Sequence, residues 1–161
     1  MNKLWGVLFI LLFFFSSAHA WEARCVSVAD GDTITVSAAG QPQVRVRLYG
    51  IDAPEKKQPY GKRSKDYLAG LVFGEIVDVT PMDTDRYGRP VAIVRVNNVS
   101  ANEEMVRAVM VWVFERYCKA GFCREWRKLE QDAQVQRTGL WEQAKLCQRS
   151  EERRVGKECR S

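Results

Sequence analysis

In its first half, the chain alternates apolar and polar residues with the two-residue period of half-buried β-strands. The alternating runs are rich in β-branched residues, and the Asp-Gly and Ala-Gly-Gln-Pro sequences between them are typical of turns. The pattern predicts five strands, at residues 22–28, 33–37, 44–49, 75–80 and 91–96, with a polar loop at 81–90 between the last two.

Helical spacing of apolar residues interrupts this pattern after residue 60. It predicts one helix that Gly74 stops before the fourth strand. After the fifth strand, Ser100 and Glu103 have the spacing of a capping box, in which each side chain bonds the other's backbone N–H. They predict a second helix that continues through Val109.

A third helix is predicted at about residues 124–137. Leu129, Ala133 and Gln136 mark one of its faces, and Gly139 ends it. Five short antiparallel strands with one helix inserted and others appended predict an α+β fold that is mainly β. We expect a small closed barrel of the OB type, with five strands and about three helices.

The first twenty residues have the pattern of a secretory signal peptide. Lys3 provides a positive start, residues 4–15 an apolar core, and residues 18–20 a small-x-small cleavage site. The apolar core is shorter than the ~20 residues that cross a bilayer, although an uncleaved anchor is the alternative. We therefore expect a secreted or periplasmic protein with no stable membrane anchor after cleavage.

Residues 149–161 are highly charged and have neither a helical nor a strand period, which predicts a disordered tail. This peptide can be encoded by a nucleotide sequence that resembles a common sequencing adapter, so we interpret it as an assembly artefact and place the domain at 21–148. The whole chain has 25 Lys and Arg residues and 20 Asp and Glu residues. Without Lys3 and the tail, which contains five basic and three acidic residues, 19 basic and 17 acidic residues remain. The net charge falls from +5 to +2, which gives little support for a nucleic-acid partner.

The predicted domain contains four cysteines and no histidine, because His19 lies in the signal peptide. Four cysteines allow three disulfide connectivities, and their closeness in sequence favours pairing Cys118 with Cys123, while Cys25 and Cys147 stay unassigned. A zinc site fits poorly without histidine or a CxxC pair. Ser-His-Asp and Cys-His hydrolysis are excluded as well.

Carboxylates and arginines remain as candidate chemical groups. They occur at three places, namely the turn with Asp32, the segment with Arg47, Asp52 and Glu55, and the loop with Arg89. A pocket of carboxylates suits calcium, and paired guanidinium groups bind phosphate oxygens bidentately. Together these groups indicate phosphodiester hydrolysis, whereas each one alone is also typical of a turn, a solvated strand face or a loop charge.

Four motifs connect these places to a known family. In order and spacing, "VADGDTITV", "VRLYGIDAPE", "DRYGRPVAIV" and "NEEMVRAVMVWV" resemble the staphylococcal nuclease (thermonuclease) family over residues 26–141. The resemblance implies a five-stranded OB barrel with three helices, and hydrolysis of DNA and RNA with calcium.

The resemblance also implies roles for the acidic residues. Asp32, Asp52 and the backbone carbonyl of Ala53 would help to hold calcium, and Glu55 would be the general base. The turn after residue 30 would then serve to present Asp32 beside Asp52. Ala53 departs from the family, because a threonine often stands there, but the backbone carbonyl is retained.

The remaining implied site residues bind the substrate. Arg47 and Arg89 would clamp the phosphate that is attacked. Arg86 and Tyr87 match positions that flank the terminal phosphate, and Tyr117 matches a tyrosine that stacks on the substrate.

Three departures concern the surroundings of this set. Glu115 stands where a second stacking tyrosine is found, the loop after Glu55 is short, and the segment from Cys118 to Cys123 replaces a simpler loop. The catalytic set itself is complete.

We therefore predict a monomeric, exported, calcium-dependent nuclease that acts on DNA, RNA or both, with single strands preferred. The main alternative is a non-catalytic OB-fold module that binds single-stranded nucleic acid. A disulfide-stapled structural protein would leave the carboxylates and arginines unexplained.

Overall fold

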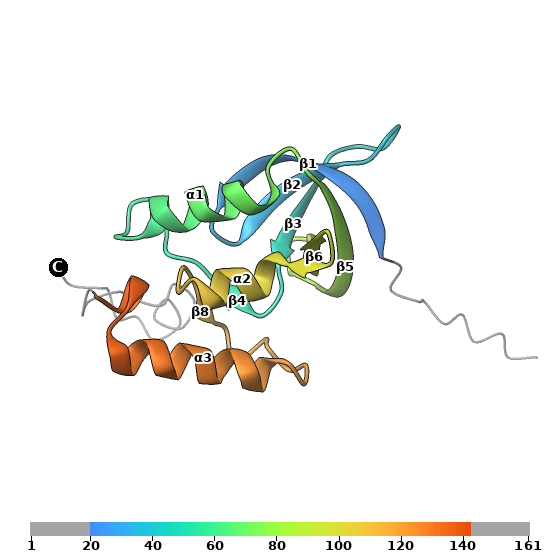
Figure 1. The fold of residues 1–161 in the computed structure, drawn as a ribbon. Helices are drawn as coiled ribbons and strands as arrows, with labels where there is room; N and C mark the ends of the chain where they lie inside the picture. The colour runs from blue at the N-terminus through green and yellow to red at the C-terminus, as the bar shows by residue number, and fades with distance from the viewer. Residues whose placement is uncertain (1–19, 143–161) are drawn as a thin grey trace, which may run out of the picture.

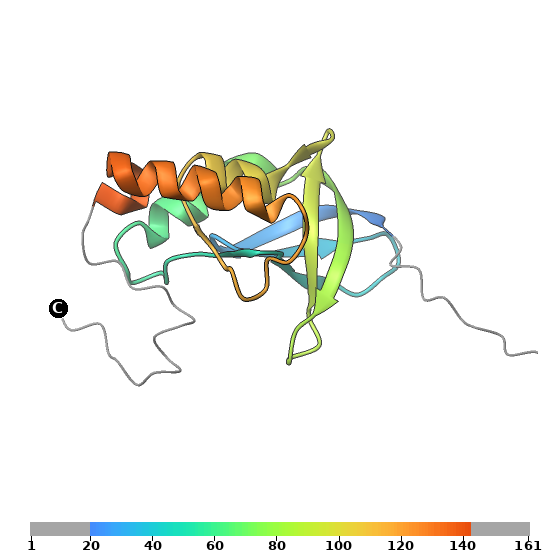
Figure 2. The same ribbon diagram turned by 90° about the horizontal axis from the view of Figure 1, so that it is seen from below.

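A computed structural model describes residues 20–142 of the 161-residue chain. The predicted tail, Cys147 and all but the last residue of the predicted signal peptide lie outside the described residues. Three helices gather at one end of a set of strands (Figures 1 and 2). The elements are β1 (Trp21–Asp30), β2 (Thr33–Ser37), β3 (Val44–Leu48), β4 (Ile51–Asp52), α1 (Gly61–Val72), β5 (Ile76–Thr84), β6 (Pro90–Val96), β7 (Val99–Ser100), α2 (Ala101–Arg107), β8 (Trp112–Val113), α3 (Cys123–Gln136) and the 3-10 turn η1 (Gly139–Glu142).

Five strands form a closed barrel in the order β3-β2-β1-β5-β6, and pairing between β3 and β6 completes the ring. The predicted barrel is confirmed, but the prediction that all five strands are antiparallel is wrong. β3 and β6 run parallel, with Arg47 opposite Val91. The reason is geometric, because a closed ring with an odd number of strands must contain at least one parallel pair. The barrel is therefore mixed.

The polar loop predicted at 81–90 is mostly strand. β5 continues to Thr84 and β6 begins at Pro90, so only residues 85–89 lie outside the ladder. Three short strands were also missed: β7 pairs with β6, and β4 pairs with β8, with Asp52 opposite Trp112. This pairing fixes the end of β4 against the segment that follows α2.

The barrel interior contains the apolar residues of the alternating pattern. Cys25 belongs to this core, is fully buried, and forms no disulfide within the part of the chain that the structure describes. Burial raises the pKa of its thiol above the ordinary value. The most deeply buried barrel side chains include Ile34, Val36, Val46, Leu48, Val77, Val79 and Val94. Between residues 20 and 142, no helix has the length and apolar character needed to cross a membrane.

α2 begins as predicted. The Ser100 hydroxyl accepts a hydrogen bond from the Glu103 N–H at 3.3 Å, but the helix ends at Arg107, because Val109 adopts a left-handed φ of 54°. Asn102 on this helix is fully buried. Its side-chain oxygen accepts from the Val94 N–H at 2.9 Å, and its amide donates to the carbonyl of Tyr49 at 3.0 Å. One buried amide thus ties α2 to β6 and to the residue that follows β3.

The predicted face of α3 is confirmed in part, because Ala133 is buried and Leu129 packs against the core. Cys123, Trp126, Glu130 and Ala133 are buried, whereas Gln136 is exposed. The apolar pattern did not include Glu130, which is buried and whose carboxylate accepts a hydrogen bond from the Val113 N–H at 3.1 Å. The helix ends at a left-handed Arg137, two residues before the predicted Gly139.

The buried Glu130 carboxyl makes stability depend on pH. Burial raises the pKa of Glu130, and the charge of Glu115 raises it further by a smaller amount. The hydrogen bond from Val113 lowers this pKa, and the net result is a value of about 7. The folded protein therefore holds this proton more tightly than the unfolded chain does, so stability falls as pH rises from about 4.5 through 7. Glu130→Gln keeps the acceptor for Val113 and cannot ionise.

We expect Glu130→Gln to match the parent in free energy of unfolding at pH 4.5 and to exceed it by about 2–3 kcal/mol at pH 8. Urea unfolding at both pH values measures this difference. Glu125→Gln, on the exposed side of the same helix, is the control and should show no such change with pH. The same difference at both pH values would contradict the ionisation argument.

Candidate active site

The site begins at the turn between β1 and β2. The hairpin that the Asp-Gly signal predicts is present, and because Asp30 pairs with Thr33, its two loop residues are Gly31 and Asp32. Neither loop residue has a positive φ. Gly31 is needed for packing instead, because a Cβ there would lie 1.8 Å from the Ser64 hydroxyl oxygen of α1. The turn is therefore pressed against α1, and Asp32 is fully buried.

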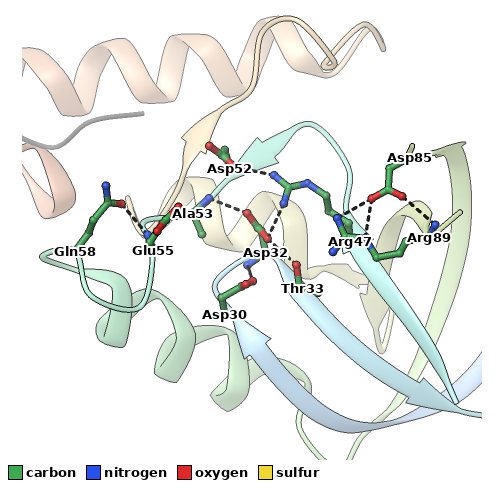
Figure 3. Close-up of polar contacts among 10 residues, drawn as sticks. All are labelled: Asp30, Asp32, Thr33, Arg47, Asp52, Ala53, Glu55, Gln58, Asp85 and Arg89. Atoms are coloured by element: carbon green, nitrogen blue, oxygen red, sulfur yellow. Dashed lines mark hydrogen bonds and ion pairs between the residues drawn. The ribbon is translucent and has the colours of Figure 1, made fainter. Parts of the chain in front are cut away.

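The Asp32 carboxylate accepts hydrogen bonds from three directions (Figure 3). The Thr33 hydroxyl donates to Oδ1 at 2.8 Å, the Ala53 N–H donates to Oδ2 at 2.9 Å, and Arg47 Nη1 donates to Oδ1 at 3.0 Å. These donors come from β2, from the residue after β4, and from β3. The barrel thus fixes the orientation of this carboxylate.

Arg47 connects Asp32 to Asp52. Its Nη2 donates to Asp52 Oδ1 at 2.7 Å while Nη1 contacts Asp32, and both carboxylates are buried. Burial lowers the pKa of Arg47, but the charges of Asp32 and Asp52 outweigh this and raise the pKa above its ordinary value. Arg47 therefore remains a cation. Its fork brings together two carboxylates that lie 20 positions apart in the sequence.

This arrangement decides which groups can hold a metal. Within residues 20–142, no three carboxylate, cysteine or histidine side chains are grouped closely enough to hold an ion. The predicted calcium ligands include only two side chains, those of Asp32 and Asp52, with the Ala53 carbonyl as the third ligand. Asp32 and Asp52 do contact one guanidinium, and the peptide of Ala53 bonds Asp32. Two carboxylates and a nearby backbone carbonyl fit calcium, which prefers oxygen ligands and completes its shell with water.

Glu55 lies on the short loop after β4. Its N–H donates to the Gln58 side-chain oxygen at 2.7 Å, and its carbonyl accepts from the Gln58 N–H at 2.8 Å. Gly61, at the start of α1, packs on the same carbonyl, which would lie 2.0 Å from a Cβ at that position. The backbone of Glu55 is therefore held against α1, at the opposite end of the site from Arg89 (Figure 3).

Arg89 lies on the turn between β5 and β6, and Asp85 orients it. Asp85 Oδ2 accepts from Arg89 Nε at 2.7 Å and from Nη2 at 2.6 Å, while Oδ1 accepts from the backbone N–H groups of Arg89 and Tyr87. Burial raises the pKa of Asp85, but these bonds outweigh it, so the net pKa lies below its ordinary value. Because Arg47 pairs with Val91, Arg89 lies near the strand that carries Arg47.

Arg86 and Tyr87 occupy the tip of the same turn. Tyr87 is exposed, and the Arg86 guanidinium lies 4.7 Å from its ring centroid. Arg86 also donates to the Tyr87 hydroxyl at 2.6 Å, and Arg89 lies 5.5 Å from the ring. The turn therefore presents two cations around one aromatic ring.

Tyr117 lies on the loop between β8 and α3. Its ring is 41% exposed and packs against Phe114 at 4.7 Å between centroids, with the Arg116 guanidinium 5.8 Å away. The Phe114 N–H donates to the carbonyl of Gly50, which lies between β3 and β4. The loop therefore starts beside the corner that separates Arg47 from Asp52.

The predicted disulfide between Cys118 and Cys123 is present. It closes the loop that carries Tyr117, and it packs on Gly50, where a Cβ would lie 2.6 Å from the Cys118 sulfur. The disulfide therefore supports the β3–β4 corner as well as the loop.

Sequence reasoning missed residues that position this site. Asp85 precedes Arg89 by four residues within a motif that was noticed, so the acid–arginine spacing was an available signal. Ser64 is buried beneath Gly31, and its hydroxyl lacks a hydrogen-bond partner within the described chain. Nothing in the sequence distinguishes Ser64, or the buried Asn102, from surface polar residues of a helix.

The fold and the site together define a class of protein, namely an OB-type barrel with buried carboxylates and two oriented arginines at one end. The family model described as "Staphylococcal nuclease homologue" matches residues 45–143. "Protein ParB" of Escherichia coli is 42% identical over 137 residues, which cover 78% of this chain and 76% of that protein.

Two further relatives have names that state an activity. An "Uncharacterized endonuclease" of Escherichia coli O157:H7 is 41% identical over 84% of this chain and 88% of its own length. A "Micrococcal nuclease" of Shigella flexneri is 36% identical over 78% of each chain. The chain belongs to the staphylococcal nuclease family. It is a nuclease, and its substrate is nucleic acid.

Proposed function

We propose that this protein is an exported, calcium-dependent nuclease that hydrolyses phosphodiester bonds of DNA, RNA or both. The observation that carries the proposal is the double contact of Arg47 with Asp32 and Asp52, which assembles cation ligands and a phosphate-binding guanidinium in one place. Arg89 on the neighbouring strand adds a second guanidinium.

Asp32, Asp52 and the backbone carbonyl of Ala53 would hold calcium. When bound, the ion supplies positive charge beside the phosphate that is attacked. The buried position of both carboxylates favours a bound cation, because carboxylate charges removed from water need compensation. Arg47 contacts both of them and orients them toward a common point.

Glu55 would act as the general base that removes a proton from the attacking water. Its backbone is held by Gln58 and packed against Gly61, which limits the positions that the side chain can reach. Arg47 and Arg89 would bind the non-bridging phosphate oxygens and stabilise the negative charge that grows on them during attack.

Arg86, Tyr87 and Tyr117 would bind the substrate on either side of this phosphate. Tyr87 and Tyr117 are exposed, and each has an arginine beside its ring. Exposed rings stack on bases that are not already stacked in a duplex, so we propose a preference for single strands. We also propose that the enzyme acts as a monomer. The disulfide between Cys118 and Cys123 supports secretion or a periplasmic location. We also propose that the mature protein has no stable membrane anchor.

The test is cleavage of single-stranded DNA by the purified protein, with calcium and with a chelator. We expect cleavage in calcium and none in chelator, followed as the release of short products. Binding of the strand without cleavage in either condition would favour the alternative, a non-catalytic OB-fold module.

Asp32→Asn tests the calcium site separately from the general base and from Arg89. We expect the calcium concentration for half-maximal activity to rise on the order of tenfold or more, with partial recovery at high calcium, because one charged ligand is removed. Asp66→Asn, at an exposed position of α1, is the matched control and should leave the calcium requirement unchanged. An unchanged requirement in folded Asp32→Asn would remove Asp32 from the calcium site.

A further inference from the structure

Five basic residues occur within ten positions that follow Glu55, and no acidic residue lies among them. We call residues 56–65 the basic segment; its cations are Lys56, Lys57, Lys62, Arg63 and Lys65. All five are exposed or half-buried, and none forms an ion pair with another described residue. Since the predicted domain has a net charge of only +2, this charge is concentrated here rather than spread over the surface.

Folding does not account for this concentration. Lys62, Arg63 and Lys65 occupy the first turns of α1, where the helix dipole is positive and cations are unfavourable. The helix packs through its other face, where Ser64 and Leu68 are fully buried. The basic side chains therefore do not contribute to the core, and at this end of the helix their charge is unfavourable.

The basic segment is also fixed relative to the proposed catalytic residues. Gln58 is hydrogen-bonded to the backbone of Glu55 in both directions, and the Gly61 N–H donates to the Gln58 carbonyl at 3.0 Å. Arg63 lies over the Tyr60 ring at 4.9 Å from its centroid. The loop with Glu55 and Gln58 leaves the site at the end opposite Arg89 (Figure 3).

A nucleic-acid strand supplies anions at regular intervals. With one phosphate held between Arg47 and Arg89, the strand has to leave the site on both sides, and the side beyond Glu55 leads to the basic segment. We propose that the basic segment binds the phosphates of the substrate strand beyond Glu55, as a second electrostatic subsite. This inference rests on the proposed function and extends it, because it makes long strands better substrates than short ones.

The test compares two double variants that each remove one lysine and one arginine from the exposed face of a helix. Lys62→Gln/Arg63→Gln removes charge from the basic segment, and Arg124→Gln/Lys128→Gln removes it from α3. Each is assayed with calcium over a series of salt concentrations, on a strand of about 20 nucleotides and on a dinucleotide. The dinucleotide contains only the phosphate that is cleaved, so it reports on the catalytic centre alone.

For the long strand, we expect the slope of log(kcat/KM) against log salt to become shallower in Lys62→Gln/Arg63→Gln only. The expected change is about 0.7 for each substrate phosphate that the variant no longer neutralises. Its melting temperature should change little, since the loss of charges that are unfavourable to α1 offsets the lost contact of Arg63 with the Tyr60 ring. An unchanged slope, or the same change in the α3 variant, would overturn the inference. Failure of the parent protein to cleave either substrate would instead contradict the proposed function.

Discussion

Glu55→Gln is expected to slow cleavage of single-stranded DNA by about 10²- to 10⁴-fold, the range typical for loss of a general base. Glutamine has the size and hydrogen-bonding capacity of glutamate but cannot accept the proton of the attacking water. The backbone contacts of Glu55 with Gln58 and Gly61 do not involve its carboxylate, so they should persist in the variant.

The measurement is kcat at saturating calcium, with circular dichroism and thermal unfolding to establish that the variant is folded. Glu22→Gln, at an exposed position of β1, is the control and should retain parental turnover. If folded Glu55→Gln kept more than about a tenth of parental kcat, Glu55 would not be the general base.

Arg89→Lys is expected to lower turnover far more than substrate affinity, by on the order of 10²- to 10³-fold in kcat. Lysine keeps the positive charge but lacks the planar fork that binds two phosphate oxygens. It also cannot reproduce the paired Nε and Nη2 contacts with Asp85 that set the direction of the guanidinium. The interaction of the guanidinium with phosphate matters most as negative charge grows in the transition state, so kcat should fall more than affinity.

Arg86→Lys provides the comparison within the same turn. Arg86 is exposed and stacks on Tyr87, so its replacement should change KM modestly and leave kcat close to that of the parent. If Arg89→Lys instead raised KM with kcat unchanged, Arg89 would be a ground-state binding residue. A non-catalytic binding module would behave differently: the parent would show no calcium-dependent cleavage, and Arg89→Lys would change only the affinity for nucleic acid.

The secondary structure was largely readable from the sequence because its signals are local. The two-residue period located the five barrel strands to within a few residues, and the Ser100–Glu103 spacing marked the start of α2. The prediction of a loop at 81–90 was wrong because it relied on local polarity alone. Polar residues continue a strand when its partner, here β6, supplies the hydrogen bonds.

Features that depend on a distant partner were not readable in this way. β4 and β8 have two residues each, which is too short for any period, and they exist because they pair with each other. The burial of Glu130 on α3 was missed because its hydrogen-bond partner, the Val113 N–H, lies on another element. Asn102 and Ser64 were missed because their burial depends on packing between α2 or α1 and the barrel.

For the candidate site too, some features follow from the sequence alone and others from the tertiary structure. The sequence by itself determined which chemical groups are available: a domain without histidine, three clusters of carboxylates and arginines, a close cysteine pair, and motifs that resemble one nuclease family. These are properties of residue type and short-range spacing, and no folding is needed to define them.

Only the tertiary structure decided how those groups meet. Barrel closure brings Asp32, Arg47 and Asp52 into one hydrogen-bonded unit, while the Glu55 carboxylate does not join a three-carboxylate cluster with Asp32 and Asp52. The glycine of the Asp-Gly turn proved to be required by contact with Ser64 rather than by backbone conformation. The physical reason is common to all of these cases: strand pairing and helix packing set distances between residues far apart in the chain, and local sequence carries no measure of those distances.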